Sequence, residues 1–395
     1  MKKIAYFLSA LLLSQCKPGT STFVAGELTE IDVFRSYPLK ELYLQDVAKV
    51  EYIPLETNVN TLMRVRTDMI VYVSDNYIIV VNRIEADIFV FDGKGKSKFS
   101  FNHRGQGPTN YNSLWGGIAF DENAKEIFVF DRAANPRIQV YAENGDYKRT
   151  FTGFPDFREI KLYSFDNETL LVYDESGVLG QSNYSHKPYL LMSKKDGSIV
   201  DTLNIHLPVR LTNAAVWRTV ENGQPMTYSM SVPITNNRSF GKDFIIADWS
   251  SDTIYRLTPQ RELLPMIVRK PPMQSTEPKI IISNFLTTDK FNLLGVYVMN
   301  YESLKDGGDI TQMQLMNDFE TGQINEYRFK NRDISSSRGT MFHEAITPKN
   351  TAVTVYDVAH LFEMDERGEI RSELKELLKS LDEEDNPILM KIKFN

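Results

Sequence analysis

The chain has 395 residues, of which 42% are hydrophobic and 25% are charged, and its formal net charge is −7. This composition is typical of a globular protein with a full core, in one large domain or two ordinary ones. The acidic balance argues against a nucleic-acid partner, because contacts with phosphates need a basic surface. The 23 Phe and 19 Tyr favour strands, since aromatic side chains pack well on a pleated sheet.

The N-terminus has the pattern of an export signal. Lysines precede the apolar stretch 4–13, which is too short to span a bilayer as a helix. Cys16 follows; it is the only cysteine and cannot form an internal disulfide. The segment LLLSQC resembles the lipobox of bacterial lipoproteins, in which this cysteine carries the lipid. We therefore predict a signal peptide over 1–15 and a lipid-anchored flexible tether over 16–29. The alternative is cleavage near Ala25 and an unmodified cysteine.

A pattern of three strands recurs along the next part of the chain. In its clearest copy, 126–151, an apolar run ends at a polar bend, and an alternating run then leads into an Asn-Gly turn and a third strand. The same order occurs over 77–101 and 169–203. The turn glycines are 50 and 52 residues apart, at Gly95, Gly145 and Gly197.

Three further copies extend the repeat. Weaker ones cover 243–257 and 295–329, and a last one combines 351–360 with the terminal strand 388–394. A period of about 40–60 residues with about four strands in each unit indicates a β-propeller. A single four-stranded sheet cannot bury both of its faces, whereas in a ring each sheet is covered by two neighbours.

Residues 107–151 resemble an NHL repeat. The matching features are the Gly-Pro loop, Tyr111, the strand 117–121 and the segment 135–140. The mature chain as a whole resembles the six-bladed β-propeller lipoproteins common in Bacteroides-type bacteria. This wider resemblance rests on the segments 43–57, 103–108, 251–255 and 381–394.

The resemblance implies an all-β domain over 30–395, a six-bladed propeller of four-stranded antiparallel blades of the NHL or TolB-like kind. It also implies export and an outer-membrane lipoprotein that faces the periplasm or the cell surface. It implies no reaction.

The two ends of the domain are expected to share a blade. Pairing of 49–56 with 388–394 would close the ring and leave no open sheet edge; the alternative is that either segment packs across an end. The segment 374–385 has helical periodicity, which predicts a short helix before the last strand and a solvated acidic loop at 382–385.

The common catalytic signatures are absent. The glycines at 105–107 do not form a dinucleotide fingerprint, and the segment 93–97 lacks the spacing of a phosphate loop. HEAIT at 343–347 lacks the second histidine of a zinc-binding HExxH motif, and the chain has no G-x-S-x-G elbow. The sequence therefore names no catalytic residue.

The loops of one propeller face are the expected binding surface. If the strands of a blade are called A to D from the axis outward, the B–C and D–A loops share a face. These loops are the long, polar ones, and binding residues usually lie on loops held by a rigid scaffold. The candidate ligand-binding residues on this face are Arg83, His103, Arg104, Gln106, Tyr111, Arg132, Asn135, Arg137, His186 and Trp249.

The arginines suggest the chemistry of the ligand. All four lie on loops of two adjacent predicted blades, and a planar guanidinium suits a carboxylate and can stack on a ring. We expect a polar or anionic ligand, such as an acidic sugar or a peptide terminus. The competing explanation is internal pairing of the arginines with Glu85, Asp87 and Asp131.

A long insertion adds to this surface. Residues 205–241 exceed what a connection between blades needs, and long loops are often functional. Trp217, Arg218 and Tyr228 are candidates for one wall of a cleft there.

The leading hypothesis is a cell-envelope lipoprotein that acts as a binding or scaffolding propeller. Its partner would be a glycan, a peptide or another protein, with no cofactor. The alternative is a metal-dependent propeller hydrolase or lyase, similar to lactonases or NHL-type lyases, with Ca or Zn. Metal ligands in propellers converge from distant blades, so the five histidines leave this alternative open: His103, His186, His206, His343 and His360.

Overall fold

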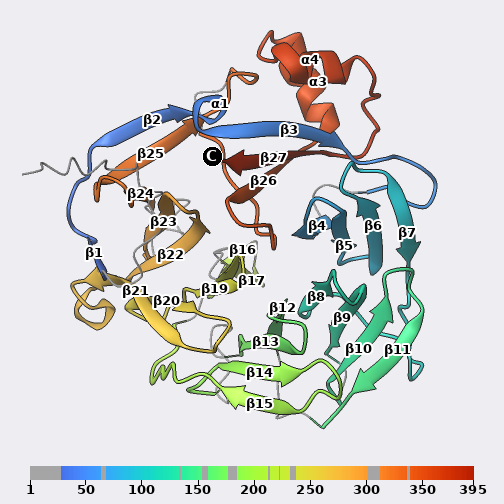
Figure 1. Ribbon diagram of the computed structural model, residues 1–395, viewed down its shortest axis with the longest axis horizontal. Helices are drawn as coiled ribbons and strands as arrows, with labels where there is room; N and C mark the ends of the chain where they lie inside the picture. The colour runs from blue at the N-terminus through green and yellow to red at the C-terminus, as the bar shows by residue number, and fades with distance from the viewer. Residues whose placement is uncertain are drawn as a thin grey trace, which may run out of the picture.

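In the computed structural model, six β-sheets stand in a ring around a central axis, which confirms the predicted all-β, six-bladed propeller (Figure 1). The described residues are 28–63, 68–132, 135–153, 159–176, 185–211, 214–221, 223–231, 237–300, 312–335 and 339–395. The predicted signal peptide, Cys16 and the tether up to residue 27 lie outside them. Within the described part of the chain, no helix is long and apolar enough to cross a membrane.

The first three blades follow one another in chain order, and each is an antiparallel sheet of four strands. Blade 1 consists of β4 (Asp68–Val73), β5 (Tyr77–Asn82), β6 (Asp87–Asp92) and β7 (Ser97–Phe101). Blade 2 consists of β8 (Ile118–Asp121), β9 (Glu126–Asp131), β10 (Arg137–Ala142) and β11 (Tyr147–Phe151). Blade 3 consists of β12 (Ile160–Ser164), β13 (Thr169–Asp174), β14 (Tyr189–Ser193) and β15 (Ile199–Thr202). The three strong copies of the sequence repeat are strands B to D of these blades.

The recurring turn glycine is required by the contact between blades. Gly145 has φ +90°, and a Cβ there would meet the ring of Phe101 at 2.7 Å. Gly197 has φ +75°, and its Cβ would meet Phe151 at 2.5 Å. In both cases the turn lies against the outermost strand of the preceding blade. Any other residue would strain the backbone and push the blades apart. The number of residues between these glycines is therefore the repeat length of the blades.

Blades 4 and 5 carry a fifth strand that the sequence did not indicate. Blade 4 consists of β18 (Asn237–Phe240), β19 (Asp243–Ile246), β20 (Thr253–Leu257) and β21 (Leu263–Lys270). Blade 5 consists of β22 (Ile280–Thr287), β23 (Phe291–Val298), β24 (Gln312–Asp318) and β25 (Ile324–Lys330), with the 3-10 turn η1 (Met273–Ser275) before it. The N-terminal strands β1 (Thr29–Asp32) and β2 (Leu39–Tyr43) add in parallel to β21 and β25. We call residues 28–43 the N-terminal strap, because they run along the outside of two blades (Figure 1).

Blade 6 closes the ring with both ends of the domain. The C-terminal strand β27 (Ile388–Phe394) lies between β26 (Thr351–Tyr356) and β3 (Ala48–Pro54), which follows the short helix α1 (Leu44–Val47). The predicted closure is therefore confirmed. The innermost position of this blade is taken by the irregular segment 339–347, in which the backbone N–H of His343 donates to the carbonyl of Val353 at 2.8 Å.

Two helices lie between β26 and β27. The predicted helix over 374–385 is α4 (Ser372–Leu378), which ends before the exposed acidic stretch 382–384. The expected strand over 351–360 ends early, at Tyr356. There Asp357 accepts a hydrogen bond from the backbone N–H of His360 and starts helix α3 (Val358–Glu366). An aspartate at this position favours a helix start, because its carboxylate satisfies a free backbone donor.

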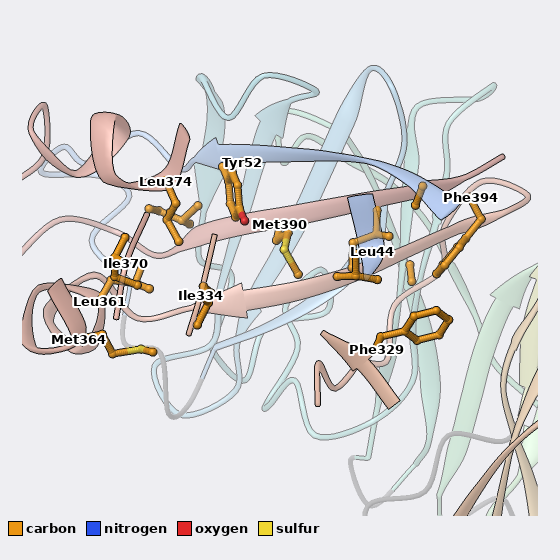
Figure 2. Packing of buried hydrophobic residues seen from close by; sticks show 14 of the residues in the cluster. Leu44, Tyr52, Phe329, Ile334, Leu361, Met364, Ile370, Leu374, Met390 and Phe394 are labelled. Atoms are coloured by element: carbon orange, nitrogen blue, oxygen red, sulfur yellow. The ribbon is translucent and has the colours of Figure 1, made fainter. Parts of the chain in front are cut away.

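The terminal strand β27 divides its side chains between its two neighbours. Leu389 packs with Ile78 of blade 1, whereas Met390 packs in a cluster with Phe329 of blade 5 (Figure 2). Helix α4 extends that second cluster through Leu374. Because side chains alternate along a strand, one terminal segment joins the last blade to the first.

Candidate functional site

A cavity of about 550 Å³ opens at the axis of the propeller. Its walls come from the innermost strands β4 and β12, and from B–C and D–A loops of blades 1 to 3. Segment 339–347 of blade 6 adds Glu344, Ala345 and Ile346. The cavity therefore lies on the face for which the sequence predicted binding loops.

The predicted insertion belongs to a D–A connection, which leaves the blades at the same face. It forms the hairpin of β16 (Ala214–Glu221) and β17 (Gln224–Ser231), within the connection from blade 3 to blade 4. In the axial view the hairpin projects onto the middle of the ring (Figure 1). The backbone register pairs Trp217 with Tyr228. The side chains of these residues and of Arg218 lie outside the described part of the structure, so the predicted cleft wall stays a prediction.

Arg132 and Glu159 form one charged pair in the lining of the cavity. Their side chains form an ion pair between blades 2 and 3. Glu159 is only 6% exposed. Burial raises the pKa of its carboxyl to about 7, because the desolvation of the charged form and the nearby Glu175 outweigh the opposing effect of Arg132. This glutamate therefore titrates near neutral pH.

Lys161 of β12 lies between two further carboxylates. Its Nζ is 3.4 Å from Oε1 of Glu175 and 3.1 Å from Oε1 of Glu344. Burial alone would lower the pKa of Lys161, but the two carboxylates outweigh it and raise that pKa. Burial also raises the pKa of Glu175, against the opposing charge of Lys161. The ammonium thus joins blade 3 to blade 6 across the cavity.

Arg83 is the third cation of the lining. Its guanidinium lies over the ring of Trp115, with the carbon Cζ 5.7 Å from the ring centroid. Among the described residues it donates no hydrogen bond, and its Nε is buried without a partner. Burial lowers its pKa. Trp115 is 54% exposed, so one part of the indole remains open to solvent.

A buried arginine supports the loop that carries Glu344. Arg238 of β18 is 3% exposed and donates to the carbonyls of His343 and Ala345, at 3.1 and 3.5 Å. Burial lowers its pKa to about 10. These bonds fix the backbone on both sides of Glu344, so the carboxylate is held toward Lys161.

The four predicted arginines separate into two groups. Arg83 and Arg132 line the cavity. Arg137 instead binds Asp131, with Nε to Oδ2 at 3.1 Å, and donates to the carbonyl of Asn110 at 2.9 Å. Arg104 is exposed and donates to the carbonyl of Ile84 at 3.1 Å. For Arg137, therefore, the structure shows the internal pairing that the sequence left open.

The other candidates lie away from the cavity in the described structure. The rings of His103 and Tyr141 are stacked with centroids 5.1 Å apart. Tyr111 is fully buried and donates to the carbonyl of Ala86, and Trp249 packs in a cluster with Tyr297 between blades 4 and 5. Three further candidates are exposed, at Gln106, Asn135 and His186.

A periodic signal could have found one of the acids that sequence reasoning missed. Strand B ends in a buried Asn or Asp in three blades, and the next residue lines the cavity. The pairs are Asn82–Arg83, Asp131–Arg132 and Asp174–Glu175. The buried side chain accepts hydrogen bonds from backbone N–H groups of the B–C loop or of a neighbouring loop. This repeated bend turns the following residue toward the axis. Glu159, Lys161 and Glu344 carry no such signal.

Among the described residues, no group of three or more His, Cys, Asp or Glu is placed to hold a metal ion. His186 and His206 are neighbours, with ring centroids 5.9 Å apart, but the described lining of the cavity contains no histidine.

Comparison with known proteins shows the family and the fold. Residues 28–393 match the family described as domain of unknown function DUF4934. A crystal structure of a candidate exported protein from Bacteroides fragilis is similar, with a TM-score of 0.61 and 16% identity, over 93% of this chain and 100% of that one. A member of the DUF4221 family from Bacteroides vulgatus has a TM-score of 0.43 and 10% identity, over 71% and 84% of the two chains. No curated protein matches the sequence.

Proposed function

This chain belongs to the DUF4934 family, and we propose that it is an exported, lipid-anchored propeller that binds a small polar ligand in its axial cavity. The observation that carries this proposal is the cavity of about 550 Å³ with charged side chains from four blades around it. Its volume is within the roughly 300–1,000 Å³ typical of small-molecule sites.

The electrostatics support a functional role for this cavity. Perturbed pKa values gather at functional sites, because binding and catalysis place charged groups where burial disfavours them. Glu159, with its pKa raised to about 7, and Glu175, with its pKa raised by burial, face the same cavity. Buried charged groups are weak contributors to stability, so their concentration around one cavity supports a role beyond folding.

A ligand screen tests the binding proposal. Purified protein would be heated with neutral, acidic and amino saccharides and with short peptides, and its melting temperature recorded. A ligand of the cavity should raise the melting temperature of the wild type and have a much smaller effect on Trp115→Ala. The matched control is Tyr43→Ala, which removes an exposed aromatic ring that stacks with Arg332, outside the cavity, at 4.7 Å. A ligand that stabilises Trp115→Ala as much as the wild type would bind elsewhere and contradict the proposal.

The anchor rests on the sequence, since Cys16 lies outside the described residues. A multiply acylated cysteine holds a protein at a membrane, whereas an unmodified chain of this composition would be released. Cys16→Ala should therefore move the protein from the membrane fraction to the soluble fraction. An unchanged membrane fraction would show that lipid on this cysteine is not the anchor.

A metal-dependent hydrolase or lyase is the second candidate. The observation in its favour is that three carboxylates face one cavity: Glu159, Glu175 and Glu344. Against it, the ammonium of Lys161 lies between two of them. Elemental analysis of the purified protein separates the two: one stoichiometric Ca or Zn per chain would favour the enzyme, and a metal-free folded chain would favour the binding protein.

A further inference from the structure

The corner formed by Arg83 and Trp115 differs from the rest of the cavity lining. The other two cations of the lining have carboxylate partners, because Arg132 pairs with Glu159 and Lys161 with two glutamates. Arg83 donates no hydrogen bond among the described residues. Its Nε is buried, and its two Nη groups make no hydrogen bond to a described residue, so the Nη donors are available to a ligand in the cavity.

This corner combines donors that suit a carboxylate with a surface that suits a ring. A guanidinium offers two parallel N–H donors that match the two oxygens of a carboxylate. The half-exposed indole of Trp115 beside it offers a flat apolar face, on which the non-polar side of a sugar ring can pack. A group that presents both features at once is a uronic acid.

The remaining lining fits the hydroxyl groups of such a sugar. An ionised carboxylate accepts hydrogen bonds and donates none, and the hydroxyl groups of a sugar can supply the donors. Glu175 and Glu344 face the cavity with side chains 23% and 36% exposed, so their oxygens remain accessible. A ligand with many negative charges would be repelled by these acids, whereas a sugar with one carboxylate and several hydroxyls would not.

We propose that the axial cavity recognises an acidic saccharide, with the carboxylate of one uronate residue bound by Arg83 and its ring packed on Trp115. This inference rests on the proposed function and narrows it to one ligand class. The neutral part of the ligand would be held by the acids of blades 3 and 6. The binding energy would come mainly from the charged hydrogen bonds to Arg83.

The test is isothermal titration of the full-length protein with galacturonate, glucuronate and a glucuronyl-glucose disaccharide, each of which carries one carboxylate, and each beside its methyl ester. The ester keeps the ring and removes the charge. At least one uronate should bind, and its ester should bind at least about tenfold more weakly, because hydrogen bonds between charged groups are the strong ones. Arg83→Ala should cause a similar loss, and Arg83→Lys a smaller one.

The control is Arg332→Ala. Arg332 also stacks on an aromatic ring, that of Tyr43 at 4.7 Å, but it pairs with Asp46 on the outer surface. The affinity of Arg332→Ala for the uronates should lie within about twofold of the wild-type value. Circular dichroism and the melting temperature show whether each variant is folded, and Arg83→Lys keeps the test valid if Arg83→Ala does not fold.

Three results would overturn the inference. If neutral saccharides or the esters bind as tightly as the uronates, the cavity is a sugar site without acid recognition, and the proposed function survives. If only short peptides bind, the ligand class is wrong and the binding function again survives. If none of the saccharides or peptides binds, the inference and the proposed function both fall.

Discussion

Lys161 offers a quantitative test of the charge arrangement in the cavity. Lys161→Met keeps the length of the side chain but removes the counter-ion shared by Glu175 and Glu344, at 3.4 and 3.1 Å. With an effective dielectric constant of about 20, each contact corresponds to about 5 kcal/mol of Coulomb energy before desolvation. Desolvation of the ammonium offsets several kcal/mol of this. The three side chains are also 23–36% exposed, so solvent screens them. We expect a net loss of about 1–3 kcal/mol in the free energy of unfolding at pH 8.

The loss should depend on pH in a defined direction. Burial already raises the pKa of Glu175, and removal of Lys161 raises it further. A carboxyl with a raised pKa in the folded state contributes stability that is present below its ordinary pKa and lost as pH rises through the folded value. Lys161→Met should therefore be less harmful at pH 5 than at pH 8.

Urea unfolding at the two pH values measures this difference. The matched control is Lys125→Met, since Lys125 pairs with Glu143 at 3.5 Å from a position that is 59% exposed. Such surface pairs contribute at most about 1 kcal/mol. If Lys161→Met behaves like this control, or loses the same amount at pH 5 and pH 8, the assigned role of Lys161 is wrong.

Three further predictions concern the fold and the acid of the cavity. Deletion of 387–395 removes β27, whose buried side chains contribute about 1.5–3 kcal/mol each. Cooperative unfolding should therefore be lost, and an unchanged melting temperature would contradict ring closure. Ile31 in the N-terminal strap is 0% exposed, so Ile31→Ala should lower the free energy of unfolding in urea by about 2–5 kcal/mol. Val59 is 96% exposed, and Val59→Ala should change that free energy by less than about 0.5 kcal/mol. Equal effects of the two substitutions would show that the strap is not part of the core. Glu159, with its pKa raised from 4.5 to about 7, contributes stability that is lost as pH rises through 7. Glu159→Gln should therefore become more stable relative to the wild type between pH 5 and pH 8, by at most about 3 kcal/mol, and a difference that does not change with pH would refute this.

Local patterns in the sequence were enough to predict the blades. Strands B to D repeat an alternating or fully apolar run, a polar bend and a glycine turn, and all of these are short-range signals. The bounds of β5 and β13 follow from such runs alone. The closure of blade 6 could also be inferred, since a terminal strand on each side was left without a partner.

The N-terminal strap could not be predicted in this way. β1 and β2 are short, and their pairing with β21 and β25 is parallel and joins residues more than two hundred positions apart. Nothing near residues 29–43 in the sequence records those partners. Only the ring, which leaves the outer edges of blades 4 and 5 open, gives these strands a place to pair.

The site was determined mainly by the tertiary structure. The sequence placed Arg83, Arg132 and Arg137 on loops of one face, but it could not tell which would face the axis. Arg132 and Arg137 lie at the two ends of one bend; the first reaches the cavity, and the second is held by Asp131. Their roles differ because the position of each residue in the fold, and not the residue type, sets the direction of its side chain.

The acids of the cavity depend even more on the tertiary structure than the arginines do. Glu159 and Glu175 are far apart from Glu344 in the chain, and each alone resembles an ordinary surface residue. The ring brings Glu175 and Glu344 around Lys161 and places Glu159 in the same partly buried space. The sequence by itself determined the repeating blade, because strand and turn preferences are local. The charged cavity was decided only when six blades closed around an axis, because burial and Coulomb interactions depend on distances that no local pattern encodes.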